Sequence, residues 1–240
     1  MEKVVYFQFD SSLNDFLPSH KKEQEFAYTF TGNPSVKDAI EAIGVPHVEI
    51  GEIIGEGGKR INLDDKVEKA ISAHVYPVGL QNYPSDITFI ADVHLGKLAK
   101  ALRLLGFDTV FDQSSTDQTI ISTAIEEHRI VLSRSINLLK NKKVQYGYWL
   151  RDQLVENQIV EVLKYFGLSS KIRPFVRCLV CNGKIDEVQK EKISTSLPAD
   201  TVKYFNEFYH CTNCSRVYWK GSHYDKMMLF IERIMKKVDS

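Results

Sequence analysis

The sequence lacks any apolar run that approaches the about 18 or more residues of a membrane-spanning helix. Its first ten residues, MEKVVYFQFD, also lack the charged-then-apolar layout of a signal peptide. These two absences predict a cytoplasmic protein that has no membrane partner. Cysteine is scarce, with four residues in 240. In a reducing compartment these thiols are expected to be free and available to a metal ion.

The chain also lacks a net charge, but its charges are unevenly distributed. Residues 1–85 carry 8 Lys and Arg against 13 Asp and Glu, whereas residues 171–240 carry 13 against 8. The stretch between them is balanced. An acidic beginning and a basic end indicate modules with different partners, and the basic end is the one suited to nucleic acid. Chance variation between solvated surfaces is the alternative at charges this modest.

The first third of the chain has the pattern of a strand pair, a helix and further strands. Strands are predicted at residues 4–9, 25–30, 50–54 and 73–78, and a helix is predicted at 36–43. Ser35 is the expected N-cap of this helix, with Asp38 in the capping-box position. Gly44 ends the helix. This order of elements is that of a β-grasp, or ubiquitin-like, domain.

Three segments support that interpretation by resemblance: LNDFLP (13–18), PSVKDAIEAIGVPHVEI (34–50) and VYPV (75–78). They resemble the ubiquitin-like domain that is attached to the Mut-seven C-terminal ribonuclease family. The resemblance implies a β-grasp domain over residues 1–80. Sulfur carriers of this fold need a free terminal Gly-Gly, and here the chain runs on past a lone Gly79. Binding of a protein partner, or scaffolding, is therefore the expected role.

The segment ITFIADVHLGKLAKALRLLGFDTVFD (87–112) predicts a strand, an amphipathic helix and a second strand. Asp92 stands at the carboxyl end of the first strand, the edge where open α/β sheets bind their ligands. Lys97, Lys100 and Arg103 are expected on the solvent side of the helix. Helices at 117–127 and 151–166 and strands at 130–132 and 144–150 follow. This alternation predicts a three-layer α/β/α domain with a mostly parallel sheet.

Two segments of this part, FIADVHLGKLAKALRLLGFDTVFD and AIEEHRIVLSRS, resemble the signatures of the ribonuclease domain of the same family. The resemblance implies a PIN-like nuclease domain over residues 86–167, in which acidic side chains hold Mg²⁺ or Mn²⁺. Asp92 and Asp117 match the first two acids of the family. The third acid is replaced, because its triplet here is Ser133-Arg134-Ser135. A site with Asp92, Asp117 and Ser135 is expected to bind a divalent cation more weakly than one with three carboxylates.

If this site is active, its reaction is metal-assisted hydrolysis of a phosphodiester bond. Lys97, Arg103 and Arg134 are then expected to hold the phosphate backbone. Simpler roles remain open for each of these residues. Asp92 and Asp117 could be N-caps of the helices that follow them, and the cations could belong to a solvated helix face.

The strongest motif is a pair of Cys-x-x-Cys sequences, Cys178–Cys181 and Cys211–Cys214, with 29 residues between them. In a reducing compartment this pattern predicts a structural zinc site of the zinc-ribbon kind over residues 174–227. The four thiolates would close the coordination shell against substrate. A redox role for the two Cys pairs is the alternative.

The segment CSRVYWKGSHYDKM (214–227) resembles the end of the same family, and it interleaves cations with aromatic residues. Arg216, Trp219, Lys220 and His223 are the candidate nucleic-acid contacts in this segment. Tyr218 and Trp219 could instead cover the zinc knuckles. A short helix at 229–238 ends the chain.

Together these features predict a metal-dependent ribonuclease that acts on RNA. Its cofactors would be a structural zinc ion and a catalytic Mg²⁺ or Mn²⁺. The alternative is a catalytically weakened or inactive RNA-binding or ribosome-associated module, because the third acidic position is Ser135. A third hypothesis is an adaptor whose acidic β-grasp domain recruits another protein.

Overall fold

The structure, a computed structural model, describes residues 2–68, 72–194 and 197–239. The chain divides into two compact units: residues 1–86 with 116–149 form the first unit, and residues 87–115 with 150–240 form the second. None of the helices in the described ranges combines the length and the apolar character that a bilayer span requires.

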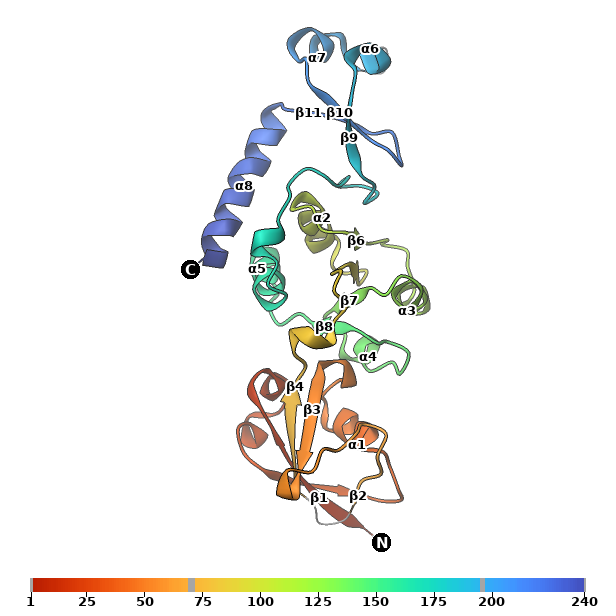
Figure 1. Cartoon of the computed structure of the whole chain (residues 1–240), viewed down its shortest axis with the longest axis vertical. Helices are drawn as coiled ribbons and strands as arrows, with labels where there is room; N and C mark the ends of the chain where they lie inside the picture. The colour runs from red at the N-terminus through yellow and green to blue at the C-terminus, as the bar shows by residue number, and fades with distance from the viewer. Residues whose placement is uncertain (1, 69–71, 195–196, 240) are drawn as a thin grey trace. The chain divides into compact units, whose positions relative to one another are not determined.

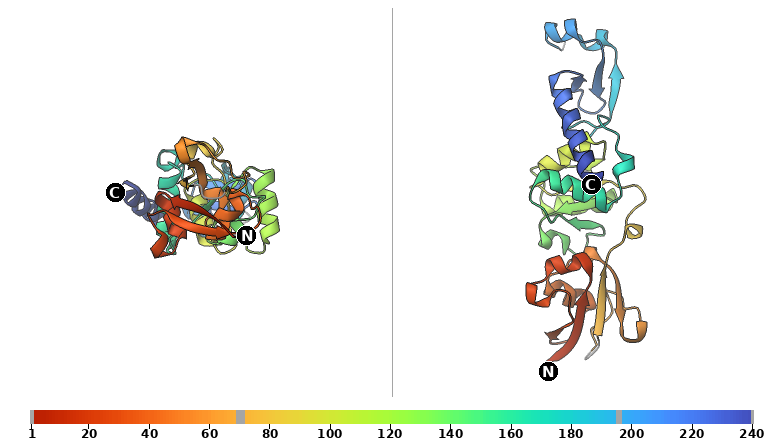
Figure 2. Two further views of the ribbon diagram at one scale, coloured as in Figure 1. Left: turned by 90° about the horizontal axis from the view of Figure 1, so that it is seen from below. Right: turned by 90° about the vertical axis from the view of Figure 1, so that its left-hand side faces the viewer.

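The first unit contains the predicted β-grasp sheet. Its strands are β1 (Lys3–Phe9), β2 (Phe26–Phe30), β3 (Ile50–Gly55) and β4 (Ser72–Pro77). The order is β2-β1-β4-β3, with β1 and β4 parallel at the centre and antiparallel pairs outside them. Figures 1 and 2 show α1 (Val36–Ile43) beside this sheet. Phe7 of β1 and Ile40 of α1 belong to one buried hydrophobic core, so the predicted β-grasp fold is confirmed.

Helix α1 begins and ends as its sequence predicts. The Ser35 hydroxyl accepts a hydrogen bond from the Asp38 N–H at 3.1 Å, and the Asp38 carboxylate accepts one from the Ser35 N–H at 3.1 Å. Gly44 follows the helix with a φ of +136°, a conformation that a side chain would strain. The capping box and the glycine therefore define the length of α1 locally.

The remainder of the first unit comes from the second third of the chain. Its elements are α3 (Asp117–Glu126), β7 (Ile130–Ser133), α4 (Ile136–Leu139) and β8 (Gly147–Trp149). Strands β7 and β8 pair in parallel, and every residue of β7 is buried. The segment that follows the β-grasp strands is bonded to this region, since the Tyr83 hydroxyl donates to the Gly147 carbonyl at 3.1 Å. The His47 ring Nε2 also lies 3.0 Å from the Val144 carbonyl.

The second unit begins with the strand–helix–strand segment. Its elements are β5 (Phe89–Ala91), α2 (Gly96–Leu104), β6 (Thr109–Val110) and α5 (Val155–Tyr165). Strands β5 and β6 pair in parallel. Strand β5 is wholly buried, and Leu98 and Leu102 of α2 are also inaccessible to solvent. Parallel pairing here and between β7 and β8 confirms the predicted α/β class.

The end of the second unit is a small antiparallel sheet followed by a long helix. The sheet order is β11-β10-β9, and the elements are β9 (Ile185–Val188), α6 (Lys190–Ile193), α7 (Ala199–Tyr204), β10 (Phe208–Cys211), β11 (Val217–Trp219) and α8 (Ser222–Asp239). Helix α8 begins directly after Gly221, so the predicted start at 229 is wrong by about two turns.

The connection from α5 to the small sheet is bonded to the end of α2. The Arg173 N–H donates to the Leu105 carbonyl at 3.0 Å, and the Phe175 N–H donates to the Leu104 carbonyl at 3.1 Å. Gly106 makes this approach possible, since a Cβ at this position would lie 2.1 Å from the Arg173 carbonyl oxygen. Its φ of +98° agrees with the sequence, which predicts a positive φ after the helix.

Helices α5 and α8 of the second unit are linked by an acid-sensitive ion pair. Glu156 of α5 lies 2.8 Å from the Arg233 guanidinium and 2.7 Å from the Lys237 ammonium of α8. The hydrogen bond from Lys237 is the main cause that lowers the pKa of Glu156 below its ordinary value of 4.5. A carboxyl group whose pKa is depressed by folding stabilises the protein above its unfolded pKa, and this contribution disappears as the pH falls through the folded pKa.

Replacing Glu156 with glutamine is therefore expected to lower the melting temperature at pH 7 by at most about 3 °C. The effect is small because these side chains are partly exposed, and such pairs contribute about 1 kcal/mol or less. The difference between variant and wild type should shrink as the pH falls below 4.5. Circular dichroism melts at several pH values measure this, and a difference that is constant with pH would contradict the assignment.

Candidate functional site

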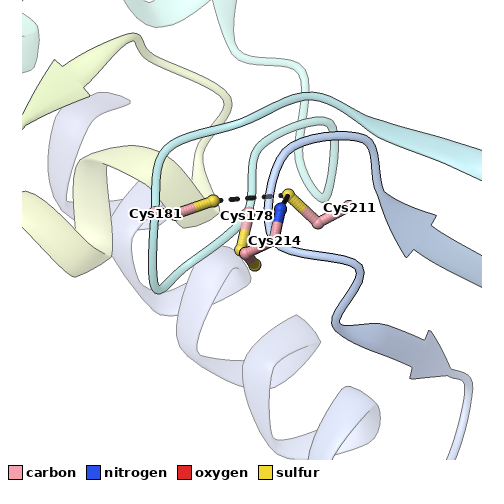
Figure 3. Close-up of side chains that lie close together, drawn as sticks. All are labelled: Cys178, Cys181, Cys211 and Cys214. Carbon is pink, nitrogen blue, oxygen red and sulfur yellow. Dashed lines mark hydrogen bonds between the residues drawn. The ribbon is translucent and has the colours of Figure 1, made fainter.

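The four cysteines converge in the second unit. Their sulfur atoms all lie within 4.8 Å of one another, and Figure 3 shows the four side chains pointing into one cluster. The Sγ atoms of Cys178 and Cys214 are 3.7 Å apart, and those of Cys181 and Cys211 are 3.3 Å apart. A tetrahedral zinc ion with Zn–S bonds of about 2.3 Å separates its sulfurs by about 3.8 Å. The cluster therefore fits a structural metal ion such as zinc.

Both Cys-x-x-Cys segments fold into the same kind of turn. The N–H of Asn182 donates to the Cys178 carbonyl at 3.0 Å, and the N–H of Ser215 donates to the Cys211 carbonyl at 3.0 Å. Asn182 and Ser215 both have positive φ values, 67° and 57°. Small polar side chains tolerate this conformation better than branched ones. The two turns thus bring both cysteines of each pair to the same side.

The thiol pKa values differ from one cysteine of the cluster to another because of burial, hydrogen bonds and neighbouring sulfurs. Burial raises the pKa of Cys178, but hydrogen bonds from the Tyr218 hydroxyl (3.0 Å) and from the N–H groups of Cys181 and Val180 outweigh it and bring the pKa to about 6. The Arg216 N–H lowers the pKa of Cys214, but desolvation and the other sulfurs raise it to about 12. Binding of a metal ion by all four thiolates would therefore release protons, and the affinity would rise with pH.

Arg103 is buried, so the prediction that it faces solvent is wrong. Only 3% of the residue is exposed, and its Nε donates to the Thr109 carbonyl at 2.8 Å. Its Nη1 donates to the carbonyls of Leu179 and Val180, at 3.2 and 2.9 Å, which lie between the two cysteines of the first pair. Desolvation lowers the pKa of this guanidinium, and the nearby charges of Cys178 and Cys181 oppose that shift. Arg103 therefore fastens the first cysteine turn to β6.

A second set of polar contacts joins the same two elements. The Asn182 side chain accepts from the Thr109 N–H at 3.0 Å and donates to the Asp108 carboxylate at 2.8 Å. Arg177 completes the set with an ion pair to Asp108 at 2.8 Å. These buried or partly buried partners satisfy one another across the contact. The first cysteine turn is thus attached by side-chain hydrogen bonds and an ion pair to the start of β6 and the residue before it.

Asp92 lies directly after β5, at the carboxyl edge of its parallel pair with β6. Only 5% of the residue is exposed, and its Oδ1 accepts a hydrogen bond from the His94 N–H at 3.4 Å. The N-cap position of α2 belongs to Leu95, so the interpretation of Asp92 as the helix N-cap is wrong. A buried carboxylate at a strand's carboxyl end has the placement that ligand-binding acids have in α/β sheets.

Asp117 is the first residue of α3 in the first unit, and it is exposed. The Thr116 hydroxyl accepts from the Thr119 N–H at 3.2 Å and caps this helix, so the capping role considered for Asp117 is wrong. A pocket of about 560 Å³ is lined by Asp117 together with Asn141, Lys142 and Lys143. Asp117 is therefore not needed as the N-cap of α3.

Ser135 occupies the position of the third acid as the N-cap of α4. Its hydroxyl accepts from the Leu138 N–H at 3.4 Å, and its own N–H donates to the Ser133 hydroxyl at 2.8 Å. In the described part of the chain, the four cysteines form the one group of three or more His, Cys, Asp or Glu side chains close enough to hold a metal ion. Among these residues no third carboxylate replaces the acid that Ser135 lacks.

The loop that contains Arg134 and Ser135 is held by the β-grasp part of the first unit. The buried Glu49 carboxylate accepts from the Trp149 N–H at 2.6 Å, and the Trp149 ring N–H donates to the Arg134 carbonyl at 3.2 Å. Phe16 packs on the Trp149 ring with centroids 4.8 Å apart. Glu49 was not predicted to have a role, because no motif surrounds it. The one signal in the sequence was an acidic residue between apolar neighbours.

A groove of about 1000 Å³ lies in the second unit between α2, β11 and α8. Its basic side chains are Lys97, Lys100, Arg216, His223 and Lys226. Its aromatic side chains are Phe205, Tyr218, Trp219, Tyr224 and Phe230. We call this feature the basic groove. It brings together four of the predicted nucleic-acid residues, namely Lys97, Arg216, Trp219 and His223.

The other predicted contacts lie elsewhere. Lys220 is paired with Glu207 at 2.6 Å and does not line the basic groove. Arg134 is half-buried and belongs to the first unit. Phe230 was missed because the predicted helix began at 229 and so did not contain residues 223, 226 and 227, with which Phe230 shares a face. With α8 starting at Ser222, residues 223, 226, 227 and 230 have the spacing of one helix face.

Two family models match the chain. A model described as the Mut7-C RNAse domain matches residues 87–231, which is more than half of the chain and includes Asp92, Asp117, Ser135 and all four cysteines. A model described as the Mut7-C ubiquitin matches residues 2–82, the part that contains the β-grasp sheet. No curated protein matches the sequence.

Proposed function

Because the chain belongs to the Mut7-C RNAse domain family, as its sequence motifs predict, we propose that it is a metal-dependent ribonuclease that hydrolyses phosphodiester bonds of RNA. The family itself places the protein among nucleases and RNA-related proteins. The observation that carries the catalytic proposal is the buried carboxylate of Asp92 at the carboxyl end of β5, in a residue that is not the N-cap of α2. Asp117, also without a capping role, is the proposed second acid.

By their match to the family, Asp92 and Asp117 are each proposed as a ligand for Mg²⁺ or Mn²⁺, whose oxygen preference suits carboxylates. When bound, such an ion supplies an acidified water and charge stabilisation for the leaving oxygen. Lys97 and Arg134 would orient the phosphate backbone by charge. The Ser135 hydroxyl would contribute a neutral oxygen at the third acidic position, which predicts a weak cation site.

We further propose that the four-cysteine cluster binds structural zinc. The sulfur separations match a tetrahedral Zn–S₄ centre, and all four thiol groups would be used as ligands. A redox role for the two Cys pairs is less well supported, because the sulfur contacts at 3.7 and 3.3 Å each join one pair to the other. Zinc at this position would join the two cysteine turns and thereby the strands that follow them.

RNA binding without cleavage is the second candidate function, and the state of Ser135 favours it. Its hydroxyl is engaged as the N-cap of α4, and it carries no charge to oppose the loss of water from a cation. In that case the basic groove would be the surface that binds RNA. The β-grasp domain adds a possible protein partner in either case, since ubiquitin-like domains are interaction modules. A cytoplasmic location stays the prediction.

The two candidates are separated by an RNA-cleavage assay with added Mn²⁺. Wild-type protein is expected to cleave a labelled RNA, and Asp92→Asn is expected to lower the rate by at least about 100-fold. A metal ion supplies several kcal/mol of charge stabilisation, and about 1.4 kcal/mol corresponds to a tenfold change in rate. Asp112→Asn is the matched control, because Asp112 is exposed and its carboxylate is bonded to Ser114.

Cleavage that survives Asp92→Asn would come from a contaminant and would overturn the ribonuclease proposal. RNA binding by a wild-type protein that does not cleave would support the second candidate. In that event Ser135→Asp provides a further arm, since it restores the third carboxylate of the family. Aspartate is also a good N-cap, so the start of α4 should be preserved.

A further inference from the structure

We propose that the basic groove binds single-stranded RNA, with its bases against the aromatic side chains and its phosphates against the flanking cations. This inference rests on the RNA-directed function proposed above and names the form of RNA that the protein takes. The groove lies wholly within the second unit, so it needs no assumption about how the two units are arranged.

The charge of the groove indicates a polyanion. Five of its lining residues are basic or potentially basic, and within the described ranges no Asp or Glu lines it. The whole chain, by contrast, has 31 acidic and 31 basic residues. A concave surface lined by one sign of charge concentrates ligands of the opposite sign, and an RNA backbone is such a ligand.

Four of the five cations that line the groove come from two helices. Lys97 and Lys100 are three residues apart on α2, and His223 and Lys226 are three residues apart on α8. Side chains at this spacing lie on the same helix face. Lys97, Lys100, His223 and Lys226 are all exposed, so their charges are available to a ligand.

The aromatic side chains decide in favour of a single strand. Tyr218, Trp219 and Tyr224 line the groove and are partly exposed, so a ligand in the groove can contact them. The bases of a duplex are stacked on one another and cannot reach such rings, whereas the bases of a single strand can stack on them. Stacking depends on the π-face that every base has, so little sequence preference is expected.

The position of Trp219 is set by the local backbone. Its ring lies 6.4 Å from the Phe205 ring, and Gly221 leaves space beside it, since a Cβ on Gly221 would lie 3.1 Å from the Trp219 ring nitrogen. Tyr218 is bonded through its hydroxyl to the Cys178 sulfur. The groove floor is therefore attached to the cysteine cluster, and its shape should depend on the bound metal.

The groove also lies next in sequence to the proposed catalytic acid. Helix α2 begins four residues after Asp92, and Lys97 belongs to its first turn. An RNA strand held by Lys97 would thus contact the end of α2 that follows Asp92. Binding in the groove would therefore position the RNA strand for the proposed reaction.

The test is fluorescence anisotropy with zinc-loaded full-length protein and no added Mg²⁺ or Mn²⁺. The probes are a labelled unstructured RNA of about 12 nucleotides, within the range of site sizes of single-strand binders, and the same strand in a duplex. The single strand is expected to bind at least tenfold more tightly. Trp219→Ala should weaken its binding about tenfold, in line with the loss of one stacked base. Lys226→Ala should weaken binding and reduce the salt dependence by about 0.7 of a counterion.

Two matched controls lie outside the groove. Tyr204→Ala removes an aromatic residue that is 69% exposed on α7, and Lys236→Ala removes an exposed cation from α8. Both should leave the affinity unchanged. If Trp219→Ala loses its zinc or its fold, Lys226→Ala and His223→Ala decide the question, because both residues are exposed.

Equal or tighter binding of the duplex, or unchanged affinity in the Lys226→Ala and His223→Ala variants, would overturn the groove proposal. If the ribonuclease proposal alone fails, the protein will not cleave RNA with Mn²⁺. It will still bind the single strand, and this binding will still depend on Trp219 and Lys226. Conversely, Mn²⁺-dependent cleavage with no effect of the groove variants on binding would overturn the groove alone.

Discussion

Replacing Cys178 with serine is expected to abolish the zinc binding proposed for the cysteine cluster and to unfold the strands β9, β10 and β11. Zinc binding contributes about 10–16 kcal/mol in small zinc-finger peptides. Few apolar side chains could compensate here, since Phe208 and Ile193 are the main buried ones that the described part of the ribbon contributes. A serine hydroxyl cannot replace the thiolate, because zinc binds the deprotonated sulfur.

Metal analysis and limited proteolysis measure this outcome. Wild-type protein should contain one zinc ion per chain, and Cys178→Ser should contain markedly less and be cut within the ribbon. Val180→Ala is the matched control, since Val180 lies between the two ligands, is 53% exposed and contributes its main-chain carbonyl to Arg103. The β-grasp core, which includes Phe7 and Ile40, should keep its native amide signals in the same variant. A Cys178→Ser protein with full zinc content and wild-type protease resistance would contradict the assignment.

Replacing Arg103 with methionine is expected to destabilise the second unit by about 3–5 kcal/mol. The substitution removes four hydrogen bonds from a charged donor and leaves the carbonyls of Thr109, Leu179, Val180 and Phe111 without that partner. Each bond to a charged group contributes about 1.5–3 kcal/mol, and a buried carbonyl without a partner costs about 1–3 kcal/mol. The methionine stem retains part of the packing, which keeps the loss below the sum of these terms.

Urea denaturation of the zinc-loaded protein gives the free energy of unfolding. Lys100→Met is the control on the same helix, and because Lys100 is exposed its effect should stay within about 0.5 kcal/mol. Arg103→Met should also weaken zinc binding in competition with a chelator, because Arg103 orients the turn between Cys178 and Cys181. Equal unfolding free energies for the two variants would show that Arg103 is not the structural link described here.

Local signals in the sequence predict much of the fold. The capping box at Ser35, the glycine after α1 and the apolar spacing of α2 are properties of short segments, and each is present in the structure. The cysteine pairs belong to the same class, because two Cys-x-x-Cys turns suit one metal wherever the rest of the chain lies. The order of the β-grasp elements also follows from local patterns.

The errors concern features that depend on packing partners. Lys97, Lys100 and Arg103 look like one solvated row in the sequence. Six residues of an α-helix turn about 600°, so Arg103 lies about 120° away from Lys97 around the axis. That rotation directs Arg103 toward β6 and the first cysteine turn, where it is buried. The end of α8 was placed correctly, but its start depends on Gly221 and the strand before it.

The sequence by itself determined the four cysteines proposed to bind a metal ion, the β-grasp and parallel-strand segments, and the aspartate after β5, because each of these is encoded within a few consecutive residues. Only the tertiary structure decided that Arg103 is a structural link and that α2, β11 and α8 together form one basic, aromatic groove. Burial and concavity arise from the segments that pack opposite one another. Arg103 contacts residues 76 and 77 positions away, and α2 and α8 of the groove are more than a hundred positions apart, so no local pattern in the chain encodes these contacts.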